Sequence, residues 1–573
     1  MIRSTRNRRR AGTHPLPSWT GPGDRVTGHA FAGRSVVRAP RGMAATSQPA
    51  ATSCAVDILR RGGHAIDAAV AANAVTAVTE PMSCGLGGDL FALVWIESEK
   101  RLYGINGSGR APAFLDSDAV SQRGLGSLPW AGPLSVTVPG AVDAWWTLHR
   151  RFGALPWHDL FDDALHLCHE GFPITDLTSF HWREWAPRLV DEPGFAELWL
   201  PHGDAPAVGR RVRNPGLGRA FELLRRDGRD GFYEGEPARR AVEVLQHAGA
   251  PWTLEDFSSH RSTWVDPLSV RYRGVDVWQL PPNGQGLAVL QMLGILEGFD
   301  LAALQPGSAD LLHLQIEAKK LAFEDRARFY ADPAFYAAPV AGLLSPTYLA
   351  ERRALLDPER ASTRPEAGRP DRSAEAKLDR GDTVCIVTAD RHGNMVSLMQ
   401  SLFLPFGSGV TVPQLGFVLQ NRGALFAVDP DHPNVVAPGK RPFHTIIPSF
   451  VTRDGEAELA FGVMGGGAQP QAELQVLVHL LDHGLGLQEA GDAPRWLHQG
   501  SSQPTGSAAD GAGIVFLESA FHPEVARELM GRGHRLGHTV GLFGGYQAVG
   551  RDRSESAWLG ASECRQDGQA AGH

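Results

Sequence analysis

The strongest constraint on the fold is a charged segment that ends abruptly at a hydrophobic strand. Residues 355–382 read LLDPERASTRPEAGRPDRSAEAKLDRGD, with three prolines and few side chains to bury, so we expect an exposed loop or linker. The β-branched run TVCIVTA follows at once in residues 383–389, and the turn DRHGN leads to a second apolar run in residues 395–402. Two such runs around a glycine-containing turn are typical of a β-hairpin. The linker therefore separates a larger part of the chain from a smaller part that begins with a strand.

Helical and strand patterns alternate elsewhere along the chain. Residues 50–61 carry apolar side chains at helical spacing and stop at Gly62-Gly63, a signal for a helix end. Residues 67–79 are apolar on nearly all sides, which predicts a buried helix. Further strands are expected at residues 90–96, 416–420, 445–451 and 457–463, and a helix at about residues 468–483. Residues 1–41, rich in Arg, Gly and Pro, are expected to form a disordered basic tail.

Composition excludes several classes of protein. Of 573 residues, 43% are hydrophobic and 21% are charged, as in a folded globular protein. A net charge of −8 argues against a nucleic-acid partner. The five cysteines form no CxxC pair, which favours a reducing compartment. No apolar run approaches the ~18 residues needed to span a bilayer, so we expect no membrane partner and a cytoplasmic location.

The common cofactor and metal motifs are absent from the sequence. There is no GxSxG, no P-loop and no HExxH. The turn at residues 281–286 lacks the third glycine of a dinucleotide fingerprint, because Val289 stands there. His479 and His483 lie one helical turn apart but have no obvious third ligand. We therefore expect neither a cofactor nor a metal ion.

Thr383 is a candidate nucleophile because of its position. If the bond between Asp382 and Thr383 is cut, Thr383 gains a free α-amine beside its own hydroxyl. That amine has a reference pKa near 8 and can accept the hydroxyl proton at neutral pH. A threonine between a linker and a strand is common, so this position alone is weak support.

Gly465-Gly466-Gly467 directly precedes the helix expected at residues 468–483. The first N–H groups of a helix have no intrahelical partner and lie at the positive end of its dipole. They can stabilise an oxyanion, and one such donor is worth roughly 3 kcal/mol in catalysis. Taken alone, the glycines are also compatible with an ordinary strand-to-helix turn.

Several stretches together resemble the γ-glutamyltransferase (γ-glutamyltranspeptidase) family of N-terminal-nucleophile (Ntn) hydrolases. The resemblance runs from about residue 44 to beyond His498, and the order and spacing of its motifs match the family. The motifs are SQPAATSCAVDILRRGGHAIDAAVAANAV, EPMSCGLGGDLFALV, GDTVCIVTADRHGNMVS, PFGSGV, PGKRPFHTIIPSF and VMGGGAQPQ. The resemblance implies an α+β fold, a four-layer αββα sandwich, in a proenzyme that cleaves itself into two subunits.

The resemblance also assigns catalytic roles. Thr383 is expected to be the nucleophile and the first residue of a small subunit, residues 383–573, after cleavage between Asp382 and Thr383. The large subunit would comprise residues 42–382, with the linker at its end. Gly465 and Gly466 match the oxyanion pair. Ser401 stands where the family has a threonine that hydrogen-bonds the nucleophile.

The substrate-binding positions depart from the family pattern. Residues 419–426, LQNRGALF, correspond to the family's LNN-type strand. Asn421 is expected to contribute to substrate binding there. Arg422 replaces a glutamine, and Leu425 replaces the aspartate that binds the glutamyl α-amine. An ammonium beside leucine would lose several kcal/mol, whereas an arginine suits a carboxylate.

The carboxylate-binding positions of the family also differ. His444 and Thr445 replace its serine pair. Its upstream arginine falls near Ser108, so that Arg110 is displaced by two residues. The asparagine two residues beyond the Ser401 position is Phe403.

Three functions are compatible with these residues. The resemblance favours cleavage of a γ-glutamyl amide such as glutathione through an acyl-enzyme. Leu425 and Arg422 favour hydrolysis of another acyl amide, of an oxamate or glutaryl type. The third is an unprocessed, non-catalytic homologue that serves as a binding protein. The expected partners are a small acyl amide and the two subunits of the same chain, and a dimer of these is left open.

Overall fold

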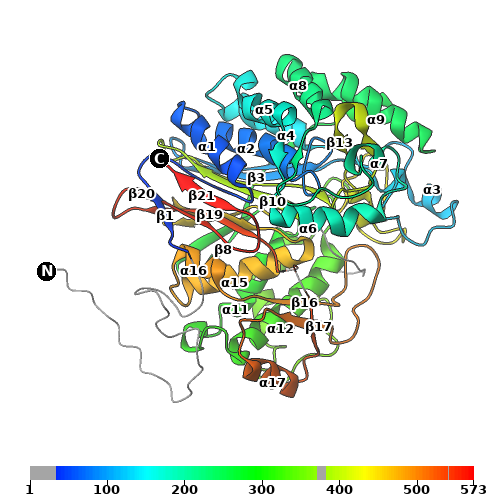
Figure 1. The fold of residues 1–573 in the computed structure, drawn as a ribbon. Helices are drawn as coiled ribbons and strands as arrows, with labels where there is room; N and C mark the ends of the chain where they lie inside the picture. The colour runs from blue at the N-terminus through cyan, green and yellow to red at the C-terminus, as the bar shows by residue number, and fades with distance from the viewer. Residues whose placement is uncertain (1–33, 371–381, 540, 542) are drawn as a thin grey trace.

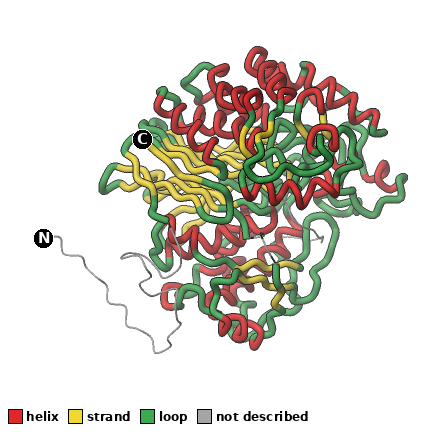
Figure 2. Tube along the Cα trace, in the orientation of Figure 1, coloured by secondary structure: helices red, strands yellow, loops and turns green. Residues whose placement is uncertain are grey.

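Two seven-stranded β-sheets stacked face to face form the centre of the computed structural model (Figure 1). The structure describes residues 34–370, 382–539, 541 and 543–573. Helices cover the outer face of each sheet, so that the layers run helix, sheet, sheet, helix (Figure 2). This is the α+β, four-layer αββα sandwich that the resemblance implies.

The first sheet contains the strand that follows the linker. Its strand order is β21 (Gln569–Gly572), β2 (Met43–Thr46), β10 (Asp382–Ala389), β11 (Met395–Phe403), β3 (Asp89–Ile96), β4 (Arg101–Gly107) and β7 (Thr263–Val265). β10 and β11 pair antiparallel on either side of the turn at residues 390–394, so the expected hairpin is confirmed. The hairpin lies at the middle of the sheet, with β2 on one side and β3 on the other.

The second sheet combines strands from both parts of the chain. Its order is β1 (Val37–Ala39), β20 (Ala557–Ser562), β19 (Tyr546–Asp552), β15 (Glu456–Val463), β14 (Ser449–Arg453), β9 (Val275–Gln279) and β8 (Leu268–Tyr272). Apolar side chains of the two sheets meet between them, among them Phe91 and Met399 from the first sheet and Phe450 from the second. Trp95 stacks on Phe450 with ring centres 6.1 Å apart.

The outer helices complete the two remaining layers. α1 (Pro49–Arg60) and α2 (Ala65–Thr79) lie on the first sheet, and every residue of α2 is buried, as its all-round apolar sequence predicts. α11 (Gly286–Leu296) and α15 (Gln469–Leu481) cover the second sheet, and α12 (Ala309–Phe329) packs against both of these helices (Figure 1).

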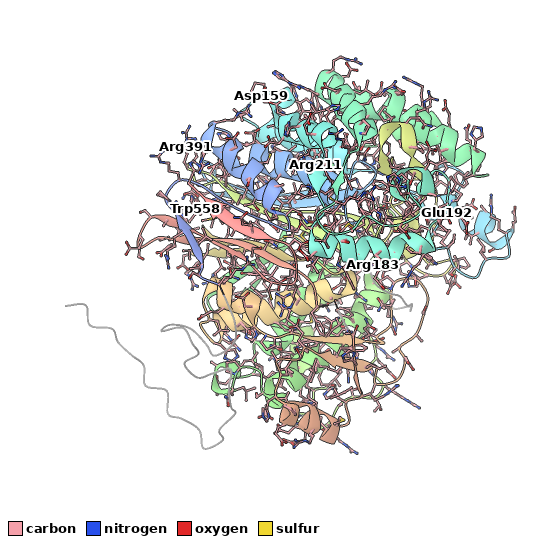
Figure 3. All side chains as sticks on the ribbon, in the orientation of Figure 1. Asp159, Arg183, Glu192, Arg211, Arg391 and Trp558 are labelled. Atoms are coloured by element: carbon pink, nitrogen blue, oxygen red, sulfur yellow. The ribbon has the colours of Figure 1, made fainter. Side chains whose placement is uncertain are left out.

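The other elements surround this centre. The helices are α3 (Ser117–Ser121), α4 (Ala141–Phe152), α5 (Asp162–Glu170), α6 (Asp176–Trp185), α7 (Phe195–Trp199), α8 (Pro215–Tyr233), α9 (Glu236–His247), α10 (Leu254–Ser258), α13 (Val340–Leu343), α14 (Pro346–Arg353), α16 (Leu487–Asp492) and α17 (Pro523–Gly531). The short strands are β5 (Phe172–Pro173), β6 (Arg211–Val212), β12 (Thr411–Val412), β13 (Phe417–Val418), β16 (Trp496–Gln499), β17 (Ile514–Leu517) and β18 (Leu536–Gly537). Arg183, Arg211 and Arg391 are exposed on the exterior (Figure 3).

A strand lies within the segment that composition predicts to be a disordered basic tail. Residues 1–33 lie outside the described part, but Val37–Ala39 forms β1 and pairs with β20. The expectation of a disordered tail up to residue 41 is therefore wrong for these residues. Their partner strand is more than 500 residues away in sequence, and local composition cannot reveal such a pairing.

The linker is only partly described. Residues 371–381 lie outside the described part, and most of residues 355–370 are exposed or half-buried. None of the helices that the structure describes is both long and apolar enough to cross a membrane.

Candidate active site

Thr383 lies at a bulge in the middle of the first sheet. Asp382 pairs with Phe403, whereas Val384 pairs with Gln400, so β11 holds one more residue than β10 across this step. A bulge bends its strand and redirects the side chains next to it. Thr383 is buried, at the end of β10 that directly follows the linker.

The hydroxyl of Thr383 accepts a hydrogen bond from Gln469. The distance from Gln469 Nε2 to Thr383 Oγ1 is 3.1 Å. Gln469 is the first residue of α15, and its Oε1 accepts the Ile447 N–H at 3.0 Å. Its amide is therefore held from both ends and orients the Thr383 hydroxyl. Sequence reasoning missed Gln469, although it stands two residues after the glycine run.

Ser401 lies on β11, across the bulge from Thr383. Its Oγ accepts the N–H of Phe403 at 2.8 Å. Phe403 itself has a φ of +81°, a strained conformation for a bulky residue that is typical of functional sites. The expected hydrogen bond between Ser401 and the nucleophile stays a prediction.

The glycine run forms the turn between β15 and α15, as expected. Gly465 and Gly466 have φ values of +118° and +56°, which explains why glycine occupies both positions. A Cβ at Gly465 would lie 3.2 Å from the Gly544 Cα. The Gly465 carbonyl accepts the Ala468 N–H at 2.9 Å. Because C=O and N–H point in opposite directions in a trans peptide, this bond fixes the direction of the Gly466 N–H.

Gln285 connects the glycine turn to the substrate-binding segment. Its Nε2 donates to the Gly466 carbonyl at 2.9 Å and to the Thr445 carbonyl at 2.6 Å. Its Oε1 accepts from Arg326 Nη1 at 2.6 Å. Gln285 is buried at the start of α11, in the turn that the sequence shows only as a helix cap. It holds the expected oxyanion donors in a fixed position relative to Thr445.

Arg422 is a buried cation, and part of its guanidinium has no hydrogen-bond partner among the described residues. Its Nη1 donates to Thr445 Oγ1 at 2.6 Å, and its guanidinium lies 5.0 Å from the centre of the Phe403 ring. Its Nε and Nη2 have no hydrogen-bond partner among the described residues. Burial lowers the pKa of Arg422 to about 9, so the group remains charged at neutral pH. Buried polar groups are rarely left unpaired, and two donors of a cation suit a carboxylate.

Leu425 lies in an apolar cluster that includes Phe403, Phe323 and Phe443. An ammonium placed among these side chains would find no hydrogen-bond acceptor in them. The environment of Leu425 therefore agrees with the loss of the family's amine-binding aspartate at this position.

His444 is paired with Asp89, which sequence reasoning missed. His444 Nε2 lies 3.1 Å from Asp89 Oδ2, and Asp89 Oδ1 accepts the Gly109 N–H at 2.9 Å. Burial raises the pKa of Asp89 to about 7 and holds the pKa of His444 well below its usual value. The ring of His444 also packs on Phe91, with centres 4.5 Å apart. Asp89 directly follows the SCGLGG turn, and this position is the only sequence feature that could have indicated its role.

The two remaining candidates use their polar groups elsewhere. Asn421 donates to the Trp130 carbonyl at 2.6 Å and accepts the Leu404 N–H at 3.1 Å. Arg110 is half-buried, and its Nη1 donates to the Arg261 carbonyl at 3.1 Å. Substrate contacts from Asn421 and Arg110 stay predictions.

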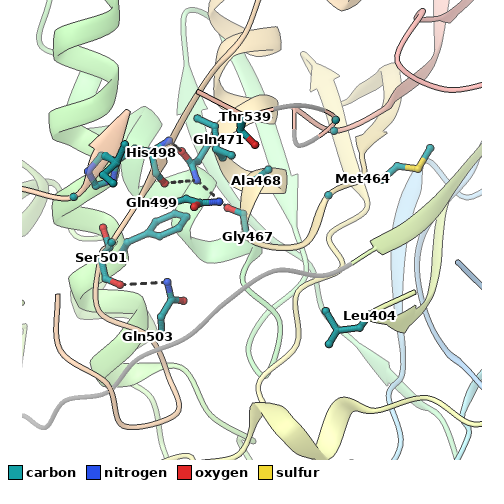
Figure 4. Close-up of a pocket in the computed structure, with 18 of the residues that line it drawn as sticks. Leu404, Met464, Gly467, Ala468, Gln471, His498, Gln499, Ser501, Gln503 and Thr539 are labelled. Atoms are coloured by element: carbon teal, nitrogen blue, oxygen red, sulfur yellow. Dashed lines mark hydrogen bonds between the residues drawn. The ribbon is translucent and has the colours of Figure 1, made fainter. Parts of the chain in front are cut away.

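A cavity of about 580 Å³ opens beside the glycine turn (Figure 4). Gly465, Gly467 and Ala468 lie in its wall, together with Leu404 from the segment after β11. Gln471 holds the turn at this point, because its Nε2 donates to the Gly467 carbonyl at 3.0 Å and to the His498 carbonyl at 3.2 Å. The cavity therefore adjoins the expected oxyanion site.

The fold and this arrangement define an Ntn hydrolase, in which a threonine begins a central strand of a two-sheet sandwich. A profile of the gamma-glutamyltranspeptidase family matches residues 51–573, and the chain belongs to that family. Membership makes it an enzyme that acts on acyl amides, with the self-cleaving proenzyme nature of the family.

Individual relatives cover nearly the whole chain. The glutathione hydrolase-like YwrD proenzyme of Bacillus subtilis is 35% identical over 523 residues, which is 90% of this chain and 95% of the relative. The oxamate amidohydrolase proenzyme of Klebsiella pneumoniae is 35% identical over 544 residues, 93% and 98% of the two chains. The crystal structure of cephalosporin acylase from Bacillus halodurans superposes with a TM-score of 0.87 at 39% identity, covering 96% of this chain and 99% of that one.

Proposed function

We propose that this protein is an Ntn amidohydrolase for an amide whose acyl group ends in a carboxylate and carries no α-ammonium, as in a glutaryl or oxalyl amide. Thr383 is its nucleophile. The enzyme matures by cleavage between Asp382 and Thr383, which gives subunits of residues 1–382 and 383–573. Relatives named as an oxamate amidohydrolase and as acylases agree with an acyl group other than glutamyl.

The observation that carries the proposal is the partly unpaired guanidinium of Arg422. Its Nε and Nη2 are buried without partners in the described part, while Nη1 is anchored on Thr445. A carboxylate can accept from two such donors at once, and charged hydrogen bonds of this kind are stronger than neutral ones. Leu425 and the phenylalanines around it offer an ammonium no carboxylate and no hydrogen-bond acceptor.

The reaction follows from the positions of the polar groups. The α-amine of Thr383 takes the proton from Oγ1 as the oxygen attacks the amide carbonyl carbon. Negative charge develops on the carbonyl oxygen, where the N–H groups of Gly465 and Gly466 stabilise it. The amine returns the proton to the leaving nitrogen, the C–N bond breaks, and an acyl-enzyme ester remains. Water then attacks the ester, giving up a proton to the same amine, and releases the acid and Thr383.

Cleavage of γ-glutamyl amides, including glutathione, is the second candidate. The name of the Bacillus subtilis relative supports it, and Asp89 supplies one buried carboxylate in the network beside Arg422. Asp89 is already bonded to His444 and to the Gly109 N–H, however, and burial disfavours its charged form. We therefore rank γ-glutamyl cleavage below hydrolysis of an amide without the amine.

The test compares two substrates that differ only in the α-amine. Glutaryl-p-nitroanilide and γ-glutamyl-p-nitroanilide are assayed on the cleaved wild type and on Leu425→Asp. An ammonium without a partner costs a few kcal/mol, so we expect wild type to prefer the glutaryl compound by roughly 10²-fold in kcat/KM. Leu425→Asp should narrow or reverse this preference. A wild type that prefers the γ-glutamyl compound would restore the second candidate.

An unprocessed protein that only binds small molecules predicts a different result. Its chain would remain intact after purification and would hydrolyse neither anilide. A chain that is split before Thr383 and active excludes this reading.

A further inference from the structure

The cavity beside the glycine turn extends away from Arg422. Its walls come from α6, from α12 and from the loop between β16 and β17, in addition to the turn itself. Arg422, Thr445 and Leu425 do not line it. A substrate with its carbonyl oxygen at Gly465 and Gly466 and its acyl carboxylate at Arg422 must place its leaving amine elsewhere. The cavity adjoins Gly465 of this pair and the next part of the turn, Gly467 and Ala468.

The size of the cavity is informative about the leaving amine. A water molecule in the liquid occupies about 30 Å³, and ammonia is of similar size. A volume of about 580 Å³ lies instead in the range of sites for whole organic ligands. An enzyme that released only ammonia would need no such space.

Lys319 places a buried amine in the cavity wall. Its Nζ donates to Ser501 Oγ at 2.9 Å and lies 2.9 Å from His498 Nδ1. His498 Nε2 lies 2.9 Å from the Ala512 carbonyl, so it carries the ring proton and leaves Nδ1 as an acceptor. An ammonium has three donors, and these two contacts use two of them. The Phe323 ring also contacts Nζ, and burial lowers the pKa of Lys319 well below its usual value. A carboxylate bound in the cavity would favour the charged form of Lys319 and accept a hydrogen bond from it.

Aromatic side chains form part of the wall around Lys319, beside polar side chains that include Glu184 and Asp510. Lys319 Nζ lies 3.9 Å from the centre of the Phe323 ring. Phe180 and Trp185 come from α6 on another side of the cavity, and Phe180 is 38% exposed. Arg188 stacks on Trp185 at 4.6 Å. Such walls suit a flat apolar body, and the amine at one point suits a carboxylate on that body.

We propose that this cavity is the leaving-group subsite for an aromatic or similarly bulky amine that bears a carboxylate, with Lys319 as the residue that binds the carboxylate. The inference rests on the proposed function, because it takes the acyl group to lie at Arg422. On this inference the enzyme releases a bulky amine, whereas an enzyme whose substrate is a primary amide releases only ammonia.

The test uses three glutaryl amides that differ in the leaving amine. They are glutaramic acid, which releases ammonia, the glutaryl amide of 4-methylaniline, and the glutaryl amide of 4-aminobenzoate. On wild type we expect kcat/KM for the two anilides to exceed that for glutaramic acid. Lys319→Met should lower kcat/KM for the 4-aminobenzoate amide by about tenfold or more, as expected for one charged hydrogen bond, and should leave the 4-methylanilide within about threefold.

Lys320→Met is the matched control on the same helix. Lys320 Nζ is bonded to Glu317 and to the Ser362 carbonyl and does not line the cavity, so this variant should change the rates of the two anilides by the same factor. If either variant fails to fold, product inhibition of wild type replaces it. In that case 4-aminobenzoate should inhibit at least about tenfold more strongly than 4-methylaniline, which lacks the charged hydrogen bond.

The outcomes distinguish this inference from the proposed function. A wild type that hydrolyses none of the three amides overturns the proposed function. Two results overturn the leaving-group subsite alone. One is a wild type whose kcat/KM for glutaramic acid equals or exceeds that for the anilides, and the other is a Lys319→Met effect that is equal for both anilides.

Discussion

Replacing Arg422 by methionine should abolish the preference for an acyl carboxylate. Methionine keeps an unbranched chain of similar length but has no N–H donor. The substitution removes the two donors, Nε and Nη2, that have no partner in the described part, together with the Nη1 contact to Thr445. Binding of a carboxylate at this point would lose its partner, whereas an acyl chain without a carboxylate would lose little.

The size of the effect follows from the two donors. Hydrogen bonds to charged groups contribute about 1.5–3 kcal/mol each, so loss of two costs about 3–6 kcal/mol. The lower end applies, because the variant also no longer carries the cost of burying a guanidinium. At about 1.4 kcal/mol per factor of ten, kcat/KM should fall by roughly 10² to 10³.

The assay compares glutaryl-p-nitroanilide with pentanoyl-p-nitroanilide, which has the same chain length and no carboxylate. Arg422→Met should lower kcat/KM for the glutaryl compound by the factor above and for the pentanoyl compound by less than about threefold, since it loses no charged hydrogen bond. Arg110→Met is the matched control, because Arg110 contacts the Arg261 carbonyl. Equal losses for both substrates would refute the role of Arg422, and a selective loss in Arg110→Met would transfer that role to Arg110.

Three further predictions concern the neighbouring groups. Gly466→Val should lower kcat by at least about 10² in a cleaved, folded protein, because a β-branched residue cannot hold the φ of +56° that directs the N–H; a near-normal kcat would place the oxyanion donors elsewhere. Gln469→Leu removes the donor at 3.1 Å from Thr383 Oγ1 and should slow self-cleavage by about tenfold, as followed on denaturing gels; unchanged cleavage would show that Gln469 does not orient the hydroxyl. Glu473 is buried on α15, four residues after Gln469, and its Oε2 accepts from Gln279 Nε2 at 2.9 Å. Burial raises the pKa of Glu473 to about 8, so the folded chain holds a proton that the unfolded chain releases, and the free energy of unfolding should fall as pH rises from about 5 to about 8. Glu473→Gln should flatten that decline in denaturant melts, and an equally steep decline in the variant would assign it to another group.

Sequence reasoning placed the start of β10 and the glycine turn before α15 correctly because both depend on local patterns. The end of the linker and the β-branched run mark the start of β10 at Thr383 within one residue. The glycine run needs positive φ values at the turn before a helix, and the structure has them at Gly465 and Gly466. Features that depend only on neighbouring residues, such as this strand start and this turn, can be predicted from the sequence.

The supporting residues could not be found in the same way. Gln285 and Asp89 reach Thr445 and His444 from positions 160 and 355 residues earlier in the chain. Their roles depend on the pairing of distant elements, which no local pattern specifies. The strand β1 was missed for the same reason, since its partner β20 lies near the other end of the chain.

The cavity beside the glycine turn, which Lys319 lines, shows a second limit of prediction from sequence. The loop between β16 and β17 reads as a Ser- and Gly-rich surface loop, yet Ser501 and Asp510 lie in the wall of the cavity. Lys319 lies on a helix whose residues are nearly all buried, and a lysine in a sequence is ordinarily taken as exposed. Only the packing of α12 against the small-subunit part reveals its contact with His498 and Ser501.

Intact mass and N-terminal sequencing of the purified full-length protein test the nucleophile most directly. We expect two polypeptides, residues 1–382 and 383–573, the second of which begins TVCIVTA. Thr383→Ala should remain one chain of 573 residues, because it lacks the attacking hydroxyl, whereas Thr383→Ser should still be cleaved. A cut at another bond, an uncut chain that hydrolyses amides, or cleavage of Thr383→Ala at the same bond would contradict the assignment of Thr383.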